Sequence, residues 1–229
     1  MSASAPERRV SFGTGPLARI SATVYTLIVI EAMFVLASAP GLLLLGMVDR
    51  DASEVPLVAL CALPLGPAWS AAVYAWNRRS TDLTDLRPAA AFRCGYRANL
   101  ADVLRLWVPW LVFAALVGTI LAHGGEAGVP GWWVGLLAVL GAVSLLWLGN
   151  ALLLASLFSF RARDTARLAA YCMVRHLRAT AVHLCLLAAA VALTTASVLL
   201  TLVCVSVFAA LSSLGGRAMT ADVQQRFTA

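Results

Sequence analysis

One acidic side chain, Glu31, lies well inside a long apolar stretch of this sequence. An ionised carboxylate in hydrocarbon is costly unless it is paired or protonated, so an intramembrane acid is a candidate functional group. Glu31 could carry a proton or a cation during transport. It could instead accept hydrogen bonds from Asn150, Thr194 or Thr195 and hold helices together. We favour packing, because His183 is the only base in the apolar stretches.

His176 and His183 are seven residues apart, which places them two turns apart on one helix face. A proton relay is conceivable, but a single histidine near a membrane interface is more often simply hydrogen-bonded. The sequence has no GxSxG, no HExxH, no phosphate-binding glycine loop with lysine and no CxxC. We therefore expect no enzyme activity, no catalytic residue, no cofactor and no metal site.

The segment before residue 107 combines an apolar helical face with arginines that leave it. The face consists of Phe92, Tyr96, Leu100, Val103, Leu104 and Trp107, and the arginines are Arg93, Arg97 and Arg105. Such a helix can lie on the inner leaflet with its arginines at lipid phosphates. It can also dock a cytosolic partner, so Phe92, Arg93, Tyr96, Arg97 and Arg105 are candidate docking residues for lipid or protein.

Long uncharged segments of the sequence must hold the candidate residues in position. Of the 229 residues, 61% are hydrophobic and 12% charged, which exceeds what a soluble core absorbs. We predict an all-α, polytopic membrane helix bundle between residues 22 and 214. The predicted spans are 22–47, 55–76, 103–122, 131–158 and 179–211. A tail covers 1–21, an amphipathic connector 77–102, and a C-terminal tail 215–229.

The last apolar block, residues 179–214, is longer than one crossing needs. As a single helix it would measure about 54 Å against a core of about 30 Å. We expect one long, kinked helix, since two spans of about 16 residues would each be short. The alternative is a sixth span, formed if the block folds back near Thr194, Thr195 and Ser197.

Arginine placement predicts the orientation. The connectors 77–105 and 161–178 are rich in arginine, whereas 48–54 and 123–130 hold more acid than base. The positive-inside rule puts the N-terminus and both arginine-rich connectors in the cytoplasm. The net charge of +6 has no basic stripe interleaved with aromatics, so the expected counter-charge is the anionic leaflet and not nucleic acid.

Two motifs give a family resemblance over nearly the whole chain. They are Leu63-Pro64-Leu65-Gly66-Pro67-Ala68, followed by Ser70-Ala71-Ala72-Val73-Tyr74, and the connector Phe92-Arg93-Cys94-Gly95-Tyr96-Arg97-Ala98-Asn99. In this order they resemble the YesL-like family of bacterial integral membrane proteins, a domain of unknown function. In the first span the chain has Glu31-Ala32-Met33-Phe34 where members tend to carry an Asn-Leu-Leu-Trp-like stretch.

The resemblance implies a multi-pass protein of the bacterial inner membrane, encoded near carbohydrate ABC transporters. We therefore expect an accessory or regulatory component of carbohydrate uptake, with ABC transporter subunits as possible partners. Ala90-Ala91, Gly95 and Pro109 also resemble the coupling loop of ABC permeases, with Ala89 in place of its glutamate. The alternative is a small solute transporter or permease-like subunit that uses Glu31. The sequence does not predict the oligomeric state.

Overall fold

The computed structural model describes residues 16–47, 54–79, 86–124, 128 and 130–227, and within these ranges it contains helices and no strand. This confirms the predicted all-α fold. The helices follow one another as α1 (Pro16–Leu45), α2 (Val55–Cys61), α3 (Leu65–Asn77), α4 (Pro88–His123), α5 (Gly131–Leu157), α6 (Ala162–Arg175), α7 (Leu177–Ala196), α8 (Val198–Val203), α9 (Val205–Gly215) and α10 (Arg217–Phe227).

Five segments of the described chain are long and apolar enough to cross a membrane, as predicted. They are Leu17–Leu45, Val55–Asn77, Pro88–His123, Gly131–Leu157 and Leu177–Ala196. Their large exposed side chains are mostly aliphatic, as expected where lipid and not water is the solvent. The chain is therefore a multi-pass helical membrane protein.

Helix α3 is the centre of the bundle. Its alanines Ala68, Ala71, Ala72 and Ala75 are fully buried, and α1, α4, α5 and α9 all pack on it. Small side chains let neighbouring helix axes approach closely, which gives packing contacts where lipid supplies no hydrophobic driving force. The predicted second span is thus two helices, since the chain breaks at residues 62–64 between α2 and α3.

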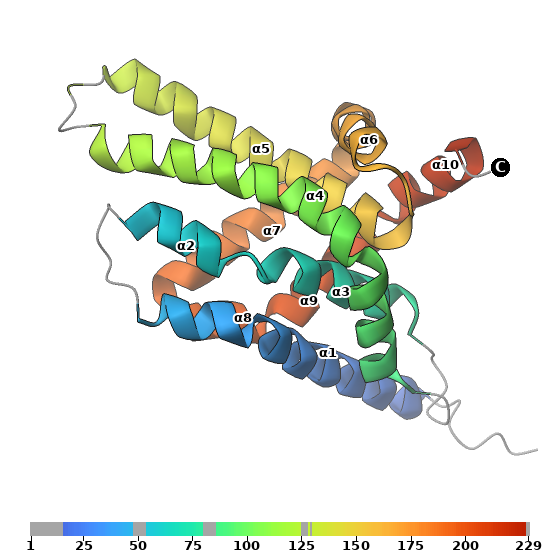
Figure 1. The fold of residues 1–229 in the computed structure, drawn as a ribbon. Helices are drawn as coiled ribbons and strands as arrows, with labels where there is room; N and C mark the ends of the chain where they lie inside the picture. The colour runs from blue at the N-terminus through green and yellow to red at the C-terminus, as the bar shows by residue number, and fades with distance from the viewer. Residues whose placement is uncertain (1–15, 48–53, 80–85, 125–127, 129, 228–229) are drawn as a thin grey trace, which may run out of the picture.

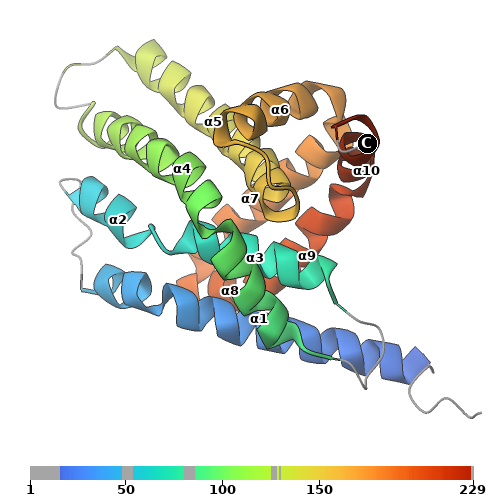
Figure 2. The same cartoon turned by 45° about the vertical axis from the view of Figure 1, so that its right-hand side comes forward.

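The amphipathic connector is not a separate helix. Helix α4 runs without interruption from Pro88 to His123 and so joins the connector to the predicted third span. A helix of 36 residues is about 54 Å long, so it must extend beyond a hydrocarbon core of about 30 Å. Pro109 inside it lacks the N–H for one helical bond, and α4 changes direction along its length (Figures 1 and 2).

The expectation of one long final helix was wrong. The backbone of Ser197 is extended, with φ −166° and ψ 128°, and it ends α7. Short α8 and then α9 return along α7, as His183 meets Ser212 and Val182 meets Gly215 (Figure 2). Thr194 hydrogen-bonds Thr201 across the turn at 3.0 Å. The charge-free sequence could not show this reversal, because both arms are equally apolar.

Two segments predicted as connector and tail form amphipathic helices. Helix α6 lies within the 161–178 connector, and α10 within the 215–229 tail. The apolar side of α10 is packed into the bundle, since Met219 and Val223 are almost completely buried. Both helices lie at the end of the bundle where α1 begins (Figures 1 and 2).

Candidate functional site

Glu31 is bound to the N-terminus of another helix. Its Oε2 atom accepts a hydrogen bond of 2.7 Å from the backbone N–H of Ser206, in the first turn of α9. Unpaired N–H groups and the helix dipole make such a terminus favourable for a carboxylate. The packing role we favoured therefore has a geometric basis, but the partner is Ser206 and not Asn150, Thr194 or Thr195.

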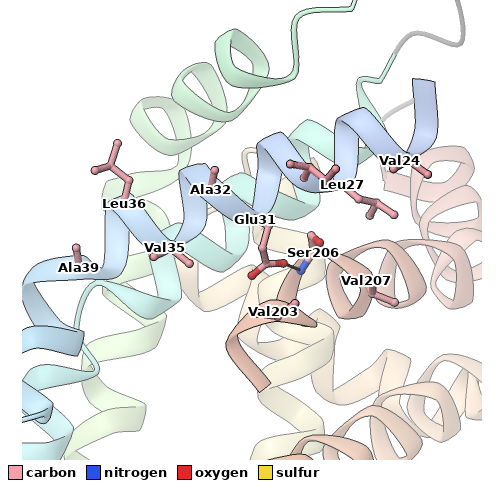
Figure 3. A pocket seen from close by; sticks show the side chains of 11 residues that line it. Val24, Leu27, Glu31, Ala32, Val35, Leu36, Ala39, Val203, Ser206 and Val207 are labelled. Carbon is pink, nitrogen blue, oxygen red and sulfur yellow. Dashed lines mark hydrogen bonds between the residues drawn. The ribbon is translucent and has the colours of Figure 1, made fainter. Parts of the chain in front are cut away.

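Glu31 also lines a groove between α1 and the returning α8–α9 arm (Figure 3). The groove has a volume of about 850 Å³, and Glu31 and Ser206 are its only polar lining residues. Aliphatic side chains, such as Leu27, Val35 and Val203, form its walls. Oε1 of Glu31 is buried and has no hydrogen-bond partner within the described part of the chain. Such a surface suits acyl chains or an apolar helix better than a hydrated solute.

His183 makes a second polar contact, away from that groove. Nε2 of His183 lies 2.9 Å from Oγ of Ser212. The imidazole covers Gly149 so closely that a Cβ there would lie 2.8 Å from the ring. The next residue, Asn150, donates to the carbonyl of Leu146 at 3.1 Å. Since Glu31 meets the start of α9 and His183 its later part, the structure does not bring the two into one site.

A buried hydroxyl and amide network, which sequence reasoning missed, joins α3, α4 and α5. Oγ of Ser156 donates to Oγ of Ser70 at 2.9 Å, and Nδ2 of Asn99 donates to Ser70 at 3.2 Å. Asn77 makes a similar bond of 3.0 Å to Ser213 of α9. The signal was present in the resemblance motifs, because Ser70 and Asn99 belong to them. Interhelical bonds of this kind hold membrane helices in register.

The first part of α4 is fixed against α3 and turns its arginines outward. Phe92 is 1% exposed, and Gly95 lies directly on the ring of Tyr74. Phe92 is therefore an internal anchor, which corrects its assignment as a docking residue. Tyr96 is half-buried and stacks on Phe92 at 6.4 Å. The outward-facing arginines are Arg93, Arg97 and Arg105, the last paired with Asp102 at 2.9 Å.

A fourth polar group connects α10 to the α6–α7 corner. Asp222 of α10 lies 3.3 Å from Nε2 of His176 and 2.7 Å from Nε of Arg226. Burial alone would raise the pKa of Asp222, but hydrogen bonds and charge from Arg226 and His176 bring that pKa below its ordinary value. Burial, with a smaller effect of Asp222, raises the pKa of the Cys172 thiol to about 11. His176 is thus tied to α10, and not to a relay with His183.

No family model, curated protein or solved structure matches the chain. The fold and the polar contacts define a multi-pass helical membrane protein whose intramembrane polar groups join its helices. The YesL-like resemblance stays a prediction. Its two motifs nevertheless meet in space at the α3–α4 interface, because Gly95 lies beneath Tyr74 and Asn99 donates to Ser70.

Proposed function

We propose that this protein is an accessory or regulatory component of carbohydrate uptake in a bacterial inner membrane, and does not itself carry solute. It would act by contacts with transporter subunits, through the outer surface of the first part of α4. The resemblance to YesL-like proteins supplies the biological setting. The geometry of α4 supplies the contact surface.

The observation that carries this proposal is that Arg93 and Arg97 project from a helix whose backbone is fixed against α3. Both side chains are exposed, while Phe92 and Gly95 on the opposite side of the same turns are locked against α3. Binding through this surface requires no ordering of its backbone, so only the arginine side chains lose conformational freedom. Its positive charge would steer it toward an acidic partner surface.

The alternative is a small solute transporter that uses Glu31. The bond from Ser206 to Glu31 weighs against it, since a carrier carboxylate must be free to exchange its partner. The groove beside Glu31 weighs against it as well, because nine of its eleven lining residues are apolar. A hydrophilic sugar would lose its hydration there without gaining hydrogen bonds.

Co-purification from native membranes tests the proposal. Arg93→Ala/Arg97→Ala is expected to lose an ATPase or permease that wild-type protein retains. Arg175→Ala/Arg178→Ala removes two exposed arginines of the other arginine-rich segment and is expected to retain it. Equal loss in both double variants would show a general charge effect and contradict a docking surface on α4.

Reconstitution separates the two functions. Liposomes that contain only this protein are expected to show no solute flux above empty liposomes. Glu31→Gln cells should grow normally on the glycan whose uptake the protein assists. Flux that depends on Glu31 would establish the transporter instead.

A further inference from the structure

A small polar pocket lies where α3 ends and α4 begins. It has a volume of about 270 Å³, and its lining includes Arg78, Arg79, Arg87, Thr26 of α1 and Ala90. Sites for drug-sized ligands occupy roughly 300–1,000 Å³, so this one fits a compact group. Unlike the groove beside Glu31, its lining carries three guanidinium groups.

The positive charge of Arg78 and Arg79 is not neutralised by an acid of the described residues. Arg79 lies 3.9 Å above the ring of Trp76 and donates to the Trp76 carbonyl at 3.2 Å. Burial, and then the charge of Arg217, lower the pKa of the Arg79 guanidinium from its ordinary value. An anion beside Arg79 would relieve both effects.

Backbone N–H groups at the start of α4 also favour a negatively charged ligand. Helix α4 starts at Pro88 and has no side-chain cap, so the N–H groups of Ala89 and Ala90 receive no capping acceptor from residue 87. Donors without acceptors, at the positive end of a long helix, favour an anion with several oxygens.

We propose that this pocket binds a phosphate group, with Arg78 and Arg79 as its principal ligands and the N-terminus of α4 as its floor. Planar guanidinium groups match phosphate oxygens in pairs, which gives both charge and geometric fit. The phosphate can belong to an anionic lipid headgroup of the inner leaflet or to a soluble phosphate. Neither source depends on the function proposed above.

The test uses full-length protein in a neutral detergent at constant ionic strength. Unfolding temperature is followed while short-chain phosphatidylglycerol or inorganic phosphate is titrated, with phosphatidylcholine as the zwitterionic control. Arg78→Gln/Arg79→Gln should bind the effective anion about tenfold more weakly. Arg175→Gln/Arg178→Gln removes two exposed arginines outside the pocket and should respond like wild type.

A third variant tests the site in case the substitutions of Arg78 and Arg79 prevent folding. Ala90 is exposed and lines the pocket, so Ala90→Asp places a carboxylate at the favourable start of α4. It should fold and lose the response to the anion. A response to phosphatidylglycerol alone identifies a headgroup site, and a response to inorganic phosphate identifies a soluble ligand. No response to either anion, equal losses in the two arginine pairs, or an unchanged response in Ala90→Asp would overturn the site.

Discussion

At the scale of single residues, Glu31 acts as a cap supplied from another helix. Helix N-terminal caps normally come from the residue just before the helix, and Cys204 supplies no side-chain hydrogen bond to α9. Glu31 of α1 reaches the Ser206 N–H instead. The carboxylate therefore fixes the break between α8 and α9 and joins it to α1.

This role predicts how substitutions change stability. Glu31→Leu should destabilise the protein by about 1–2 kcal/mol, the usual cost of losing a cap. Ser206→Pro should cost a similar amount, because proline is tolerated in the first turn of a helix but has no N–H to donate. The measurement is the denaturation midpoint in mixed micelles.

The control is Ser206→Ala, which keeps the backbone donor and should change stability by less than about 0.5 kcal/mol. The double variant Glu31→Leu/Ser206→Pro should lose less stability than the sum of the losses in the two single variants. The reason is that each single substitution breaks the same hydrogen bond. Strict additivity would mean that Glu31 stabilises the fold by another contact.

At the scale of elements, α10 is held by apolar packing on one side and by Asp222 on the other. Met219 and Val223 are buried, and Asp222 joins His176 to Arg226. The lowered pKa of Asp222 means that folding favours its ionised form. Ionised Asp222 therefore contributes to folding stability above the ordinary aspartate pKa of about 3.9. This contribution is lost as the pH falls through the lowered pKa of Asp222.

Hydrogen exchange of residues 217–227 measures this contact. Asp222→Asn should lower the protection of α10 at neutral pH, and wild type should show the same loss below about pH 4. Asp102→Asn breaks the exposed pair with Arg105 on α4 and should leave α10 unaffected. If Asp222→Asn kept full protection at neutral pH, buried Met219 and Val223 alone would hold the helix.

How far the sequence predicts these elements depends on the kind of signal. Long apolar blocks indicated the positions of five spans, because bilayer thickness sets a minimum helix length, but the last span ends at Ala196 and not at residue 211. The reversal at Ser197 had no comparable signal, since no charge separates α7 from α9. The break before α3 fell at Pro64, but hydropathy does not distinguish a broken span from a continuous one.

The candidate residues show the same limit. Glu31 could be identified from the sequence, because placing a carboxylate in hydrocarbon costs free energy. Its partner Ser206, however, lies 175 positions away and contributes only its backbone N–H. Any residue except proline could supply that N–H, so side-chain chemistry gave no indication of the partner. Phe92 was correctly placed on an apolar face, but amphipathicity does not reveal whether lipid, a partner or α3 covers that face.

At the scale of the whole molecule, the reversal at Ser197 brings the final arginines to the arginine-rich end. The starts of α1 and α4, the α5–α6 connection and α10 all lie at one end of the bundle (Figure 1). Arg217 and Arg226 of α10 thereby join the arginines of the two long connectors. A single final helix would have placed them at the opposite end, where the described residues carry no arginine. The returning arm therefore satisfies the positive-inside rule along the described chain.

Cysteine labelling in a cysteine-free background tests this topology. Arg93→Cys and Gln225→Cys should react with a membrane-impermeant maleimide only after the cells are permeabilised, because both exposed positions lie at the arginine-rich end. Gly128→Cys, between α4 and α5, should react in intact cells. A bundle with five crossings would instead expose position 225 outside while keeping position 93 inside. The reactivity of position 225 thus distinguishes a C-terminal arm that returns through the membrane from one that ends at its outer face.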